Sequence, residues 1–116
     1  MTKPTIFKNP LYELLRTEQV EEFNKRKAAG ESTEGLLRGG DFRGLDLRNL
    51  DAVGLDLRDG YFRSADLRGI DFRQTNIEGA SFCLAQISGC YFPIAVPAEE
   101  IRLSIDLGIR IRYHKV

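Results

Sequence analysis

Few side chains in this chain have a type and spacing suited to catalysis. His114 stands near the end of the chain without an accompanying motif, and a lone histidine of this kind is usually a solvated side chain. The two cysteines are too few for a disulfide framework. The aspartates recur at regular intervals, in the same position of successive short blocks, and do not converge on one place. We therefore predict no catalytic residue, no metal site and no cofactor, and a protein that is not an enzyme.

The spacing of the aspartates comes from a five-residue repeat that fills residues 35–94. Its twelve blocks read GLLRG, GDFRG, LDLRN, LDAVG, LDLRD, GYFRS, ADLRG, IDFRQ, TNIEG, ASFCL, AQISG and CYFPI. The middle residue of a block is never polar, Asp usually precedes it and Arg usually follows it. A period of five fits neither a helix nor a flat strand. Each block is predicted to be a very short strand plus a corner, often made by glycine, and blocks that turn the same way form a solenoid.

The middle residues also predict how many blocks make one coil. They alternate between aliphatic side chains and phenylalanine, with Ala52 as the exception, so the underlying repeat is ten residues. Ten divides a four-sided coil of twenty residues but not a three-sided coil of fifteen. Four sides would stack Phe42, Phe62 and Phe82 in one column, with small residues such as Gly40 leaving room for the rings. The predicted structural core consists of Leu37, Phe42, Leu47, Leu57, Phe62, Leu67, Phe72, Ile77, Phe82, Ile87 and Phe92.

The block ADLRG at 65–69 has Ala, then Asp, then Leu, then two free positions. In this pattern the repeat resembles the pentapeptide-repeat family. The resemblance implies an all-β solenoid, a right-handed quadrilateral β-helix, here of about three coils. Some members of the family resemble DNA and bind DNA gyrase, and many have no assigned role. The flanks resemble those of short bacterial members, with a helix before the solenoid and a basic strand after it.

Two flanking segments are predicted to close the ends of this single domain, which we divide into residues 1–34, 35–94 and 95–116. Residues 1–9 should be extended or disordered. Asn9 and Pro10 predict a helix start, and Thr17 predicts the cap of a second helix that ends near Gly30. We interpret this helical part mainly as a cover over the first coil, with a partner-docking helix as the alternative.

The C-terminal segment is predicted to hold one helix and one strand. Pro97 should open the helix and Gly108 should end it. Residues 109–113 alternate between apolar and polar side chains, which predicts a strand that caps the last coil or pairs across a two-fold axis.

The charges of the chain argue against several classes of partner. Lys plus Arg equals Asp plus Glu at 17 each, so the net charge does not point to nucleic acid. We expect each repeat arginine to pair with the aspartate of its own block, and we keep an arginine ladder for phosphates as the minor alternative. The sequence has no apolar run long enough to span a membrane and no basic-then-apolar leader, so we expect a soluble, cytoplasmic protein.

The third predicted coil, residues 75–94, carries only one charge, Glu78. Such a coil is expected to be covered, either by the C-terminal segment or by a second copy of the protein. Cys83 should point outward and Cys90 inward, so we expect no bond between them. Tyr61 or Tyr91 could anchor a partner, although surface packing is the simpler role.

We therefore predict a non-enzymatic interaction or scaffold protein whose partner is another protein, with a second copy in a homodimer as one candidate. Regulation of DNA gyrase, a topoisomerase or another nucleic-acid enzyme is the alternative. The candidate interface residues are Leu84, Tyr91, Ile94, Ile109, Ile111 and Tyr113.

Overall fold

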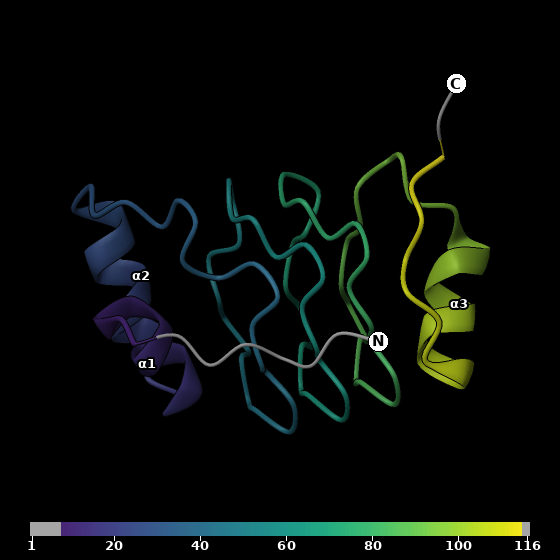
Figure 1. The fold of residues 1–116 in the computed structure, drawn as a ribbon, viewed down its shortest axis with the longest axis horizontal. Helices are drawn as coiled ribbons and strands as arrows, with labels where there is room; N and C mark the ends of the chain where they lie inside the picture. Colours follow the sequence, from purple (N-terminus) through teal and green to yellow (C-terminus); the bar gives the residue numbers. More distant parts are fainter. Residues whose placement is uncertain (1–7, 115–116) are drawn as a thin grey trace.

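The computed structural model describes residues 8–114 and contains three helices in that range. They are α1 (Pro10–Arg16), α2 (Val20–Ala28) and α3 (Ala98–Leu107). Figure 1 shows α1 and α2 at one end of the molecule and α3 at the other, with the repeat region between them. The predicted disorder at the start of the chain falls largely on residues 1–7, which lie outside the described range.

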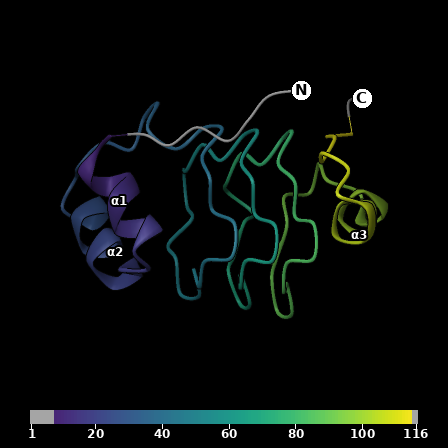
Figure 2. The same cartoon turned by 60° about the horizontal axis from the view of Figure 1, so that its bottom comes forward.

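The repeat region returns to the same place every twenty residues. Six parallel β-bridges join residues exactly one such interval apart: Asp41 to Tyr61, Asp46 to Asp66, Asp56 to Asn76, Tyr61 to Ser81, Asp66 to Gln86, and Asp71 to Tyr91. Each coil therefore holds four blocks, and we number the coils first (35–54), second (55–74) and third (75–94). The successive coils are visible side by side in Figures 1 and 2.

The prediction of an all-β fold is confirmed only in part. Each bridge is isolated, so the described residues form no strand longer than a single bridged residue. The helices are the only continuous regular elements among these residues. The reason is the short block, which contains a turn and leaves too few residues for consecutive ladder bonds. The predicted strand at 109–113 is also absent. Within residues 109–113 only Ile111 makes backbone–backbone hydrogen bonds, donating to the carbonyl of Ala80 and accepting from the N–H of Gly79.

Each corner is a tight turn between two neighbouring blocks. The carbonyl of a middle residue accepts a hydrogen bond from the N–H three residues later, as between Leu57 and Gly60 at 3.2 Å. The residue before that donor usually has positive φ, which glycine adopts without steric cost. Asp59 and Leu84 adopt it as well, at φ of 59° and 58°.

The interior of the coils is filled by the middle residues of the blocks. Nine of the eleven predicted core residues are buried, while Ile87 and Phe92 in the third coil are only partly buried. The rings of Phe42 and Phe62 stack with centroids 5.0 Å apart, and Phe62 and Phe82 meet edge to face at 5.1 Å. A Cβ at Gly60 would lie 2.8 Å from the Phe62 ring, so glycine is needed beside the column.

Helices α1 and α2 pack against the first coil. The side chain of Asn9 accepts a hydrogen bond from the N–H of Tyr12 and caps α1, with Pro10 at its first turn, as the sequence predicted. The predicted role of Thr17 is wrong, because this residue ends α1 and its hydroxyl donates to the carbonyl of Glu13 at 2.8 Å. Helix α2 begins after Gln19, which makes no side-chain cap.

Candidate interaction surface

The end of the repeat that faces α1 and α2 is sealed by hydrogen bonds to its backbone. The N–H of Asp41 donates to the Tyr12 hydroxyl at 2.9 Å, and the N–H of Asp51 donates to the Asn24 Oδ1 at 2.9 Å. The N–H of Asp46 donates to the carboxylate of Glu18. Three walls of the first coil thus have their outward backbone donors satisfied by side chains of the helical segment.

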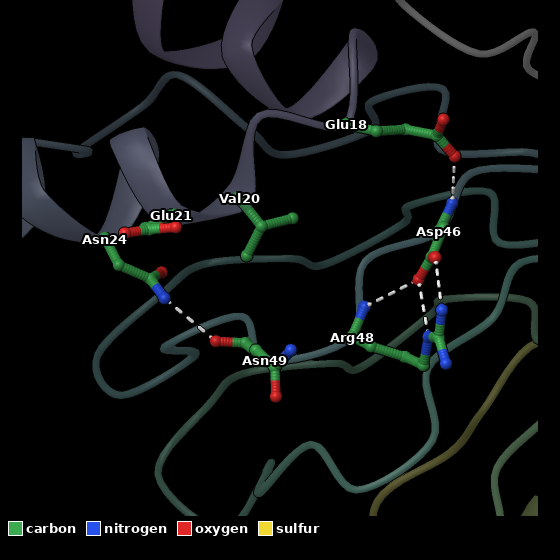
Figure 3. Close-up of a pocket in the computed structure, with 7 residues that line it drawn as sticks. All are labelled: Glu18, Val20, Glu21, Asn24, Asp46, Arg48 and Asn49. Atoms are coloured by element: carbon green, nitrogen blue, oxygen red, sulfur yellow. Dashed lines mark hydrogen bonds and ion pairs between the residues drawn. The ribbon is translucent and has the colours of Figure 1, made fainter.

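A polar hollow between α2 and the first coil is a consequence of these contacts (Figure 3). It is lined by Glu18, Val20, Glu21, Asn24, Asp46, Arg48 and Asn49. Its main polar groups already have partners: Asn24 donates to the carbonyl of Asn49 at 2.8 Å, and Arg48 donates through two nitrogens to the carboxylate of Asp46. We therefore assign the hollow to the closure of the first coil.

The opposite end of the repeat is closed along the first half of the third coil. The N–H of Ile77 donates to the Tyr113 hydroxyl at 2.9 Å, and the N–H of Phe82 donates to the Ser104 hydroxyl at 2.8 Å. Gly79 and Leu84 donate to the carbonyls of Ile111 and Ile105. Helix α3 and the segment after it therefore act as a partial fourth coil.

The second half of the third coil has no such cover within the described residues. In the second coil Leu67, Gly69 and Phe72 donate to carbonyls of the third coil. Their counterparts twenty residues later are Ile87, Gly89 and Phe92, and among residues 8–114 their N–H groups have no hydrogen-bond partner. We call residues 85–94 the open half-edge.

The carbonyl groups of the open half-edge also lack the partners that their counterparts in the second coil have. Ala65 and Ile70 accept hydrogen bonds from the third coil, at Gln86 and Tyr91. The corresponding carbonyls one coil later belong to Ala85 and Cys90, and within the described part of the chain neither accepts a hydrogen bond. The open half-edge therefore presents both donors and acceptors, which is what an added backbone segment needs.

The side chains of the open half-edge are mostly apolar and partly exposed to solvent. Ile87, Cys90 and Phe92 pack on the core without being fully buried, whereas Ile94 is fully exposed and Tyr91 is 58% exposed. Residues 85–94 contain no charged side chain. Apolar surface next to unpaired backbone groups is typical of an interaction surface.

The predicted interface residues fall into two groups. Leu84, Tyr91, Ile94 and Ile109 are exposed. The prediction is wrong for Ile111, which is buried at 1% exposure because its backbone closes the third coil. Tyr113 is half-buried, and its hydroxyl is used in the same closure.

The repeat arginines and aspartates form pairs within their own blocks. Arg43, Arg48, Arg58, Arg68 and Arg73 each donate through two side-chain nitrogens to the aspartate two residues earlier. These hydrogen bonds hold the pKa of Asp41 and the pKa of Asp46 at about 2. The pairs neutralise most of the arginine side chains that a phosphate ladder would require.

The other residues considered for chemistry do not assemble into a site. Cys83 accepts a contact from Arg63 at 3.1 Å, while the thiol of Cys90 donates to the carbonyl of Leu67 at 2.9 Å, and both cysteines are free. Burial raises the pKa of the Cys90 thiol. His114 is exposed. Among residues 8–114 no cluster of three or more His, Cys, Asp or Glu side chains could hold a metal ion.

Comparison with known proteins bears on the repeat itself. A family model described as pentapeptide repeats matches residues 61–92 in eight copies. Residues 61–92 are thus pentapeptide repeats, as the sequence predicted. No curated protein matches the chain, and no solved structure matches it either. The twenty-residue backbone register of these repeats extends back to the first coil, where Gly39 donates to the carbonyl of Arg58 at 2.8 Å.

Two residues that serve the closing segment, Ser104 and Glu100, were not singled out from the sequence. Ser104 is a polar residue at 0% exposure, and its type gives no sign that it serves the N–H of Phe82. Glu100, also buried, accepts from the backbone and from the guanidinium of Arg112.

Within residues 8–114 no helix is long and apolar enough to cross a membrane.

Proposed function

We propose that this protein is a non-enzymatic interaction protein built on a right-handed quadrilateral β-helix. The parallel bridges at intervals of twenty residues support four short walls per coil. The right hand is supported by the strong general preference for right-handed connections between parallel β-segments. The protein acts by binding a partner. The proposed binding surface is the open half-edge, because it combines unpaired backbone groups with exposed apolar side chains.

The partner that fits the open half-edge best is a second copy of the chain. A two-fold axis places the same surface opposite itself, so a surface with charges of one sign would face charges of the same sign. Residues 85–94 carry no charge, and such a contact therefore has no like-charge repulsion from these residues. The N–H groups of Ile87, Gly89 and Phe92 and the carbonyls of Ala85 and Cys90 make this edge complementary to a second copy of itself.

Sedimentation equilibrium over a concentration series tests the homodimer. The wild-type protein should form a dimer, and Ile94→Glu should form a monomer, because it places two carboxylates against an apolar surface that loses its water. The matched control is Val53→Glu, which adds the same charge at a side chain that is 46% exposed in the first coil and should leave the dimer intact.

Two results would contradict the homodimer. One is a wild-type protein that stays monomeric at all concentrations, and the other is a dimer equally stable in Ile94→Glu and in the wild type. Regulation of DNA gyrase stays an alternative prediction. A supercoiling assay with the purified protein tests it, and unchanged supercoiling would exclude it.

A further inference from the structure

One wall of the repeat departs from the pairing of arginine with aspartate. The second wall consists of the blocks at residues 40–44, 60–64 and 80–84. Tyr61 occupies the position that holds aspartate in most arginine-containing blocks, so Arg63 has no carboxylate in its own block. The Arg63 side chain is exposed and contacts the Cys83 sulfur at 3.1 Å. Within residues 8–114 it forms no ion pair, unlike the five arginines that bind their own aspartates.

Further guanidinium groups gather on the second wall. Arg43 stands one coil before Arg63, and coils lie about 5 Å apart. Arg110 reaches the wall from the C-terminal segment, with its guanidinium carbon 5.1 Å from the centre of the Tyr61 ring and its Nη2 donating to the Tyr61 hydroxyl at 2.7 Å. Arg43, Arg63 and Arg110 therefore share this wall, and Arg110 contacts its tyrosine.

The three blocks of the second wall contain a single carboxylate, Asp41. The side chain of Asp41 is 7% exposed, and its carboxylate is already shared between Arg43 at 2.8 Å and Arg16 at 3.1 Å. The wall thus carries more positive than negative charge at its surface, in a chain whose net charge is zero.

We propose that the second wall binds an acidic, extended segment of a partner protein through Arg63, with Arg43 and Arg110 adding positive charge beside it. Arg43 already donates to Asp41, and Arg110 already donates to the Gly79 carbonyl and the Tyr61 hydroxyl. A guanidinium group can bind a carboxylate with two parallel hydrogen bonds, and the partly exposed Tyr61 ring adds an apolar contact. The strip is narrow, because the arginines of the neighbouring walls are paired with carboxylates: Arg58 with Asp56 and Arg38 with Asp59 on one side, Arg48 with Asp46 and Arg68 with Asp66 on the other. A wide nucleic-acid duplex would place most of its phosphates over these neutralised walls, whereas an extended peptide can lie along the strip.

This surface is separate from the open half-edge, so its test does not depend on the homodimer. Fluorescence anisotropy with a labelled hexaglutamate peptide measures binding to the full-length protein at low salt. Arg63→Gln should weaken binding about fivefold and Arg63→Glu about tenfold or more, and added salt should weaken wild-type binding. The Ile94→Glu variant should bind the peptide like the wild type.

The matched control is Arg38→Gln, because Arg38 also lies in a block without aspartate but stands on the first wall and pairs with Asp59. It should bind hexaglutamate like the wild type, and circular dichroism should show both glutamine variants folded. No binding of the peptide by the wild type, or an equal loss in Arg38→Gln and Arg63→Gln, would overturn the proposal. A short oligonucleotide that binds more tightly than hexaglutamate and depends on Arg63 would also overturn it, in favour of a nucleic-acid partner.

Discussion

The hydroxyl of Tyr12 accepts a hydrogen bond from the backbone N–H of Asp41 at 2.9 Å. Tyr12 is fully buried between α1 and the first coil, so this N–H has no access to water. Tyr113 does the same at the other end of the repeat, where its hydroxyl accepts from Ile77 at 2.9 Å. Each end of the coil thus uses a tyrosine in place of the carbonyl that a further coil would supply.

Tyr12→Phe should destabilise the protein by about 1–3 kcal/mol, because it removes the acceptor and leaves a buried donor without a partner. Urea denaturation followed by circular dichroism measures the loss. Tyr91→Phe is the control, since Tyr91 is 58% exposed and should change the free energy of unfolding very little. Equal effects of the two variants would show that the Tyr12 hydroxyl does not seal the first coil.

Gly60→Ala should cost about 1–3 kcal/mol through overpacking. The added methyl would lie 2.8 Å from Cε2 of Phe62 and 3.1 Å from the carbonyl of Leu57. The Phe62 ring lies between Phe42 and Phe82, which leaves it little room to move. Thermal unfolding of a double-mutant cycle checks the cause: in a Phe62→Leu background the same Gly60→Ala change should cost clearly less. Strictly additive losses would argue against the clash.

Leu84→Gly should stabilise the protein by about 0.5–1 kcal/mol. Leu84 has a φ of 58°, a left-handed conformation that costs about 1–2 kcal/mol for a residue with a Cβ and that glycine adopts freely, against a smaller entropic cost in the unfolded chain. Its backbone bond to the carbonyl of Ile105 is unaffected by the change. Leu84→Ala keeps the Cβ and should bring no gain, so stabilisation by both variants would point away from backbone strain.

The protein should lose stability in acid as Asp41 is protonated. The two side-chain donors of Arg43 hold the pKa of Asp41 at about 2, below its ordinary value. A lowered pKa in the folded state stabilises the fold above the ordinary value of about 4, and this contribution disappears as the pH falls toward about 2. The side chain is 7% exposed, so the loss should reach about 2 kcal/mol.

Chemical denaturation at a series of pH values measures this loss. Asp41→Asn should lower stability at neutral pH and flatten the profile between about pH 4 and pH 2. Asp46→Asn should flatten it much less, because the Asp46 carboxylate is 43% exposed and solvent screens its pair with Arg48. An unchanged profile in Asp41→Asn would assign the acid sensitivity to other carboxylates.

The interior of the repeat could be predicted from the amino-acid sequence alone. A block of five residues with an apolar middle position places Phe42, Phe62 and Phe82 in one column, and the ten-residue alternation requires the coil of twenty that the bridges show. This was predictable because the contacts recur at a fixed interval along the chain, so local pattern and long-range contact carry the same information.

The ends of the repeat were decided only by the tertiary structure. Whether Ser104, Ile111 or Tyr113 reaches the third coil depends on how far α3 and the following segment extend across it, and no periodic pattern relates these residues to Phe82, Gly79 or Ile77. The same segment covers half of that coil and stops, so Ile87 and Phe92 keep a core sequence but remain partly exposed. Backbone donors have no side-chain signature, and for this reason their pairing, and the open half-edge that lacks it, appear only once the chain is folded.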